Sequence, residues 1–138
     1  MNRNDLQKLS KIRLKESKAL LDSGLYEGAY YLAGYSVECA IKACIAKNTK
    51  KCAFPDKELA IHAWDHDLEK LVGLAGIGSK LKDEMKANKK LQVNWALVKD
   101  WKVDSRYELG ISYSQAKDYY SACTTRKDGI LSWIKKRW

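Results

Sequence analysis

One long apolar segment constrains how this chain can fold. From Ala29 to Ala46, only Ser36, Glu38 and Lys42 interrupt the apolar residues, apart from the hydroxyl groups of tyrosines. A helix that is apolar on nearly every side lies either at the centre of a protein or across a membrane. The two charges in its middle argue against a membrane span, where charged side chains are costly. We therefore predict a buried helix from Leu25 to Asn48, and no membrane partner.

The rest of the chain fits one all-α domain built around that helix. A length of 138 residues is enough for one core, so residues 1–138 are expected to form a single domain. One Pro, eight Gly and many Leu, Ala, Lys and Glu residues favour long helices over strands. Further helices are expected from a cap at Asn4 or Asp5 to Asp22, from near Lys57 to Leu71, from a cap at Ser79 through Leu81 and Met85, and across Leu91 to Val98 after an interruption at Asn88. One last helix is expected from Ser114 to a basic end at Lys135 to Trp138.

The four cysteines match neither a metal site nor a disulfide framework. Their spacing contains no CxxC pair, and Cys39 and Cys44 fall inside the apolar helix. The polar start of the chain carries no hydrophobic signal segment, so we expect a cytoplasmic protein with reduced core thiols. Cys52, in a basic loop from Asn48 to Pro55, is the candidate for an exposed thiol. No motif calls for a metal or a cofactor, and none is expected.

The net charge of the chain suggests an anionic partner. It is +9 at pH 7, and RNA or another polyanion would suit it. Two alternatives remain open. The basic residues are interleaved with acidic ones, as on solvated helix faces, and the basic end from Lys135 to Arg137 suits the C-terminus of a helix by its dipole.

The most informative polar residues are Glu38 and Lys42 together with Arg106-Tyr107. Glu38 and Lys42 are four residues apart, so both side chains leave one face of the helix. Burying two charges is costly unless further hydrogen bonds compensate, and we expect Arg106 to supply them. The alternative is an ion network with a purely structural role.

Three segments resemble the HEPN domain family. They are Gly28 to Ala43, then His66 to Leu71, then Trp101 with Ser105-Arg106-Tyr107. The resemblance implies an up-and-down bundle of four or five helices that forms a homodimer, with the Arg106 residues facing a shared cleft. Family members include toxins, antiviral ribonucleases and partners of minimal nucleotidyltransferases.

The resemblance also implies site residues. In the family's ribonucleases an Arg is followed after four to six residues by the catalytic His. Arg106 matches that Arg, but Ile111, Ser112 and Tyr113 occupy the places of the His. Some toxin members carry Arg-x4-His-x-Tyr, and Tyr113 keeps the Arg-to-Tyr distance.

The roles carried over from the family are therefore binding roles first. Arg106, Tyr107, Tyr113 and Lys42 are expected to bind RNA or a nucleotide, and Arg106, Glu38 and Lys42 to be catalytic if the protein is active. Losing the acid–base group typically costs about 10²–10⁴-fold in rate, whereas a guanidinium still grips phosphate.

We therefore expect an RNA- or nucleotide-binding protein with a degenerate ribonuclease site, in a toxin–antitoxin or antiviral-defence system. The alternatives are an active metal-independent HEPN ribonuclease toxin, and a non-catalytic interaction subunit of a nucleotidyltransferase in which Trp133 and Trp138 dock the partner. A cognate antitoxin is a further expected partner. Of the two histidines, His66 is expected to start a helix and make a structural hydrogen bond, and His62 to lie on a loop or helix face.

Overall fold

The computed structural model describes residues 1–49 and 65–138. Cys52, His62, most of the predicted basic loop and the predicted helix start near Lys57 lie outside the described residues. Within those residues the chain is helical and contains no strand, which confirms the all-α prediction. The elements in chain order are α1 (Arg3–Asp22), α2 (Tyr26–Thr49), α4 (Leu68–Leu74), α5 (Gly78–Ala87), α6 (Lys89–Val98), the 3₁₀ helix η1 (Val103–Tyr107), α7 (Tyr113–Thr124) and α8 (Ile130–Lys135).

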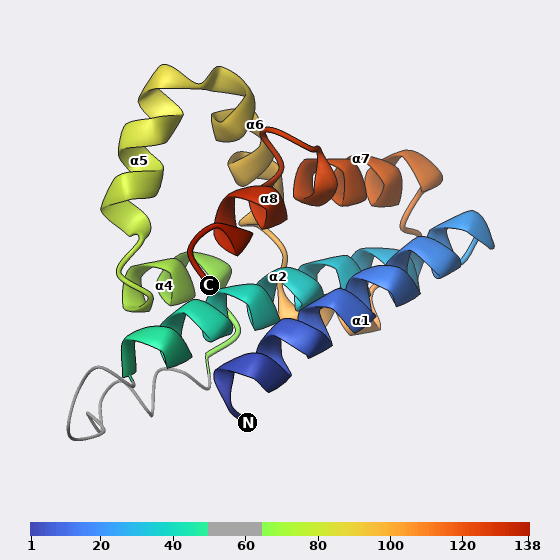
Figure 1. Cartoon of the computed structure of the whole chain (residues 1–138). Helices are drawn as coiled ribbons and strands as arrows, with labels where there is room; N and C mark the ends of the chain where they lie inside the picture. Colours follow the sequence, from blue (N-terminus) through green and yellow to red (C-terminus); the bar gives the residue numbers. More distant parts are fainter. Residues whose placement is uncertain (50–64) are drawn as a thin grey trace.

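Helix α2 is the centre of the bundle, as predicted. It packs against α1, α4, η1, α7 and α8. Its residues Ala33, Val37, Ala40, Ile41 and Ala43 are completely excluded from solvent. Figure 1 shows α1 running antiparallel beside α2, with the later helices on the other sides of α2. None of the described helices combines the length and hydrophobicity needed to cross a bilayer.

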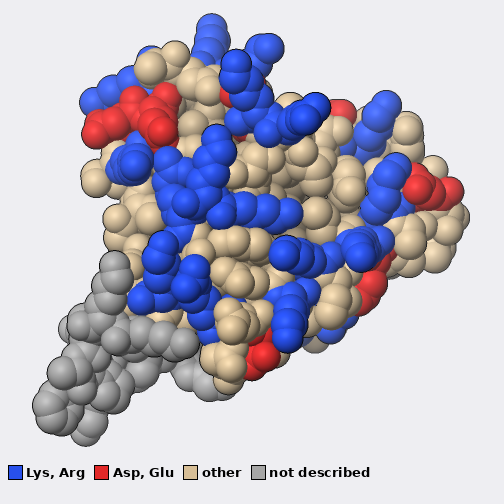
Figure 2. Space-filling view, in the orientation of Figure 1, with Lys and Arg blue, Asp and Glu red and all other residues tan. Residues whose placement is uncertain are grey.

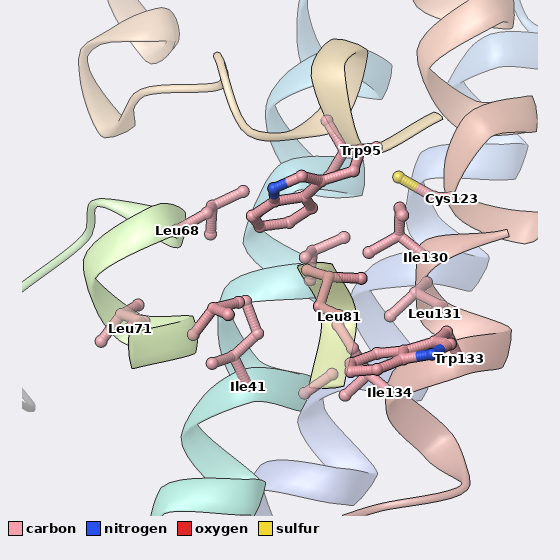
Figure 3. Packing of buried hydrophobic residues seen from close by; sticks show 14 of the residues in the cluster. Ile41, Leu68, Leu71, Leu81, Trp95, Cys123, Ile130, Leu131, Trp133 and Ile134 are labelled. Carbon is pink, nitrogen blue, oxygen red and sulfur yellow. The ribbon is translucent and has the colours of Figure 1, made fainter. Parts of the chain in front are cut away.

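The core lies between α2 and the helices that follow it. In Figure 3, Ile41 of α2 faces Leu68 and Leu71 of α4, while Ile134 of α8 approaches from the other side. Trp133 of α8 is also buried, with its indole Nε1 donating to Glu84 and the Arg137 guanidinium over its ring. Trp133 is therefore not free to dock a partner, contrary to that expectation.

Four helix boundaries differ from the sequence prediction. The helix predicted to run through to Leu71 is not continuous, because residues 65–67 are not helical and α4 begins at Leu68. The N-cap of α1 is Asn2 rather than Asn4 or Asp5, and Asp5 completes a capping box with it. Helix α5 begins at Gly78 without a side-chain cap, so Ser79 does not cap it. The predicted last helix is two helices separated by a turn that ends at Gly129, the N-cap of α8.

The break before α8 has a steric cause. The Thr125 hydroxyl donates to the carbonyl of Ser121 at 2.5 Å, and the Gly129 amide donates to the carbonyl of Thr125 at 2.9 Å. A β-carbon at Gly129 would overlap the backbone of Thr125. The apolar spacing continues through the turn because α7 and α8 face the same core. The sequence pattern therefore predicted one continuous helix from Ser114 onward.

Gly34 positions the segment that carries Arg106. Trp101, which is 1% exposed, lies against Gly34, and its ring stacks on Tyr31 with 5.9 Å between centroids. A β-carbon added at Gly34 would overlap the indole. Because Trp101 lies only two residues before the start of η1, this close approach anchors η1 to α2.

We predict that Gly34→Ala destabilises the protein by roughly 3 kcal/mol, because the rigid indole must move out of a packed core. The matched control is Gly73→Ala in α4, where an added β-carbon meets nothing within 4 Å. That change should leave stability equal or raise it by about 0.5–1 kcal/mol through reduced backbone entropy. Urea unfolding of both variants measures the difference, and equal free energies of unfolding would contradict the anchor.

Candidate functional site

Glu38 is the most unusual residue of the core. It is a carboxylate only 3% exposed, in the middle of α2. Its Oε2 accepts from Lys42 Nζ at 3.3 Å, and its Oε1 lies 2.8 Å from His66 Nδ1. The i to i+4 pairing of Glu38 with Lys42 is as predicted. The expectation that Arg106 would be the third partner is wrong, because His66 takes that position.

The chain on both sides of His66 holds it in place. Asp67 caps α4, its side chain accepting from the amides of Glu69 and Lys70 at 3.0 and 3.1 Å. The Asp65 side chain accepts from the Asp67 amide at 2.9 Å, and Leu68 directly after the cap is fully buried. The predicted structural hydrogen bond of His66 at a helix start is therefore confirmed, and its partner is Glu38.

The Glu38–His66 contact fixes what the imidazole can do. An ionised carboxylate only accepts hydrogen bonds, so a neutral His66 donates through Nδ1–H and keeps a lone pair on Nε2. The His66 side chain is 47% exposed, whereas that of Glu38 is 4% exposed. The buried carboxylate thus orients a histidine whose side chain is half exposed, which is the arrangement that general bases use.

The cysteines near the network are chemically quiet. Cys39, Cys44 and Cys123 are buried and free, as predicted for reduced core thiols. Burial, with the charge of Glu38 as the second cause, raises the pKa of Cys39 to about 12. Burial raises the pKa of Cys44 to about 11 and that of Cys123 further. Thiols of such high pKa carry almost no nucleophilic thiolate at neutral pH.

Arg106 lies on η1 and is exposed. Its guanidinium carbon lies 4.9 Å from the ring centroid of Tyr107, which is 73% exposed. Among the described residues no carboxylate pairs with Arg106. Trp101, just before η1, contacts Gly34, and His66, just before α4, contacts Glu38. Because Gly34 and Glu38 are four residues apart, the two segments meet successive turns of one face of α2.

Two buried polar atoms mark the contact between α2 and η1. The Nε1 of Trp101 and the Oγ of Ser105 have no hydrogen-bond partner among the described residues. A buried unpaired polar group typically costs about 1–3 kcal/mol of stability. The segment beside Arg106 is therefore not optimised for stability alone.

Tyr113 does not join Glu38 and Lys42. It begins α7, where its ring lies 5.5 Å from that of Tyr26 and under the ammonium of Lys117. Tyr26 precedes Glu38 by twelve residues, about 18 Å along the helix axis. Ile111, one of the positions where the family resemblance led us to expect a histidine, is 6% exposed and belongs to a small apolar cluster with Leu21, Ala29 and Ala116.

The fold and these contacts can now be set beside known proteins. The family model for the HEPN domain matches residues 5–138, nearly the whole chain. The chain belongs to the HEPN domain family. The family as a whole is associated with nucleotide binding and ribonuclease-like activity. No curated protein and no solved structure is similar enough to count as a match.

The sequence alone indicated several candidate site residues of this HEPN domain. Glu38, Lys42 and Arg106 were singled out, and the structure places Arg106 on a helix that packs against α2. His66 was expected to start a helix and make a structural hydrogen bond, but its partner Glu38 was not predicted. Its available signal was the pair of acidic neighbours that fix the backbone around it, but no sequence pattern gives a distance across 28 residues.

We predict that Lys42→Met destabilises this HEPN domain by roughly 2 kcal/mol or more, because a buried carboxylate loses a charged partner. Lys18→Met is the matched control, since Lys18 forms an i to i+4 pair with Asp22 at 2.8 Å on the exposed surface of α1. There solvent replaces the lost partner, and we expect little change. Chemical denaturation at pH 7 compares the two variants. Equal losses would show that Glu38 does not depend on Lys42.

Proposed function

We propose that this HEPN domain binds RNA or a nucleotide at the surface where η1 and His66 meet α2. The observation that carries the proposal is that Trp101, which anchors the helix η1 that bears Arg106, and the half-exposed His66 contact successive turns of one face of α2. A guanidinium without a carboxylate partner suits two phosphate oxygens, and Tyr107 beside it offers an exposed ring to a base or sugar. Lys42 adds a second cation on the same face of α2.

The wider role follows from the family and is part of the proposal. We place the protein in a toxin–antitoxin or antiviral-defence system, with an antitoxin or a minimal nucleotidyltransferase as partner. A homodimer would bring two Arg106 residues to one cleft and double the positive charge there. Light scattering of the purified chain at micromolar concentration should then give twice the monomer mass, and a monomer alone would remove the shared cleft.

Binding is tested with a labelled single-stranded RNA and the Arg106→Ala variant. Losing a charged hydrogen-bonding group is worth about 1.5–3 kcal/mol, so we predict an affinity lower by roughly tenfold or more. Arg126→Ala is the matched control, because Arg126 is also exposed and lies in the turn before α8. Fluorescence anisotropy gives both affinities. Equal affinities of the two variants would place the RNA away from Arg106.

A second candidate function is favoured by the Glu38–His66 pair, namely metal-independent RNA cleavage. His66 Nε2 would take the proton of a ribose 2′-OH, and the 2′-oxygen would attack phosphorus. The P–O5′ bond then breaks, leaving a 2′,3′-cyclic phosphate and a 5′-oxygen that receives the proton. Arg106 would stabilise the charged phosphorane. Here His66 replaces the histidine that the sequence lacks at position 111.

Cleavage is tested in EDTA with the native chain and His66→Gln, which keeps an amide donor toward Glu38. If the second candidate is right, native protein releases 2′,3′-cyclic phosphate ends and His66→Gln is slower by about 10²–10⁴-fold. The free energy of unfolding of His66→Gln is measured in parallel to separate chemistry from stability. No cleavage by the native chain, with binding intact, leaves the binding function alone.

A further inference from the structure

A row of lysines runs along the outer face of α1. Lys8, Lys11, Lys15 and Lys18 are spaced by three, four and three residues, so they share one face of the helix, and all are exposed. We call these four residues the α1 lysine row. Figure 2 shows Lys and Arg side chains gathered over α1 and α8 on this face of the molecule, with few acidic side chains between them.

The acidic residues of α1 do not neutralise this row. Asp5 accepts from the Asn2 amide at 3.2 Å, and Glu16 pairs with Arg13 at 2.5 Å. Only Asp22 belongs to the row's own face, and it pairs with Lys18. Among the described residues, the other three lysines of the row therefore have no carboxylate partner, and their charge is available to a ligand.

At one end, α8 adds a further cation against the row. The ammonium groups of Lys11 and Lys135 lie 5.7 and 5.8 Å from the ring centroid of Trp138. Burial, with the charge of Lys11 as the second cause, lowers the pKa of Lys135. Arg3 Nη2 donates to the Trp138 backbone oxygen at 2.5 Å and so holds the backbone of Trp138 in place. The fold holds two ammonium groups close to one aromatic ring. An anionic ligand would offset the electrostatic repulsion between them.

At the other end, α7 continues the same pattern. Lys117 lies over the ring of Tyr113 at 5.5 Å, and Tyr113 is 48% exposed. The charge of Lys18 opposes the burial-driven rise in the pKa of Tyr120, which places this α7 tyrosine beside the row. An aromatic ring thus lies at each end of the row, with a further lysine beside it.

We propose that the α1 lysine row, with Lys135 and Lys117 at its ends, binds the phosphate backbone of a single-stranded nucleic acid, with Trp138 and Tyr113 as stacking surfaces for its bases. The row is about 15 Å long from Lys8 to Lys18. Grooves that combine a basic path with aromatic rings bind single strands with little sequence preference, over about 4–16 nucleotides.

This surface is separate from the site of the proposed function, and does not depend on it. The row lies on the face that α1 presents in Figure 2, whereas the segment around η1 is partly hidden behind α1 and α2 in Figure 1. Arg106 belongs to η1, so its replacement should not affect the row. The two surfaces could hold different parts of one strand.

The test measures how binding of a fluorescein-labelled oligo-uridine depends on salt. Each phosphate contact on a single strand contributes about 0.7 to the slope of log affinity against log salt concentration. We predict that the double change Lys11→Gln with Lys15→Gln lowers that slope by about 1.4 and weakens binding roughly tenfold at low salt. Lys11→Arg with Lys15→Arg should retain the native slope, because the charges remain.

The matched control removes the same charge elsewhere. Lys82 and Lys86 of α5 are also exposed and four residues apart, so Lys82→Gln with Lys86→Gln changes the net charge equally. We expect this control to retain the native slope. Equal slope changes in the two double variants would overturn the proposal, because net charge alone would then explain binding. Circular dichroism checks that every variant is folded.

Two further arms fix the ligand class and the site. Trp138→Leu should weaken binding of the single strand more than that of a duplex, and equal binding of both by the native chain would overturn the stacking role. The nucleic-acid proposal would be overturned if the protein bound phosphatidylserine vesicles through Lys11 and Lys15 but did not bind oligo-uridine. With Arg106→Ala in the background, the loss caused by the Lys11 and Lys15 changes should persist, and its disappearance would show that there is only one site.

Discussion

Glu38 is a carboxylate inside the central, largely apolar helix α2, and the arrangement around it follows from the cost of burying that charge. Lys42, one turn later on the same helix, compensates one oxygen, and His66 compensates the other. His66 directly precedes Asp67, the N-cap of α4, so its contact with Glu38 places the start of α4 beside the middle of α2. The charge in the core therefore determines where α4 begins, and leaves a half-exposed imidazole at the surface.

The neighbouring turn of α2 holds a second segment, η1, through close packing rather than through charge. Gly34 has no side chain, which lets the indole of Trp101 approach the helix backbone and hold η1 there. A small residue and a buried charge, four positions apart, thus bring two distant segments to one face of α2. Helix α1 packs elsewhere on α2 through buried serines, with Ser10 and Ser36 donating to each other's backbone carbonyls at 2.8 Å. Its outer face is left free for the lysine row.

Much of this could be predicted from the sequence because it depends on local spacing. The apolar run specified α2 as the central helix, and the four-residue step specified the Glu38–Lys42 pair. What could not be predicted depends on contacts between distant segments or on turns within a periodic pattern. Arg106 was expected at Glu38 because it was the only other cation that resembled a family site residue, whereas His66 supplies the partner. The last helix appeared continuous because α7 and α8 bury the same kind of side chains, and Ile111 could not be assigned to a second core cluster without the fold.

Nitrogen NMR of the histidine ring tests most directly whether Glu38 orients His66. At a pH where the ring is neutral, ¹⁵N shifts distinguish a protonated Nδ1 from a protonated Nε2, and a His62→Gln variant assigns the signals. We predict that His66 carries its proton on Nδ1 in the native chain and loses this preference in Glu38→Leu. A proton on Nε2 in the native chain, unchanged in Glu38→Leu, would contradict the account.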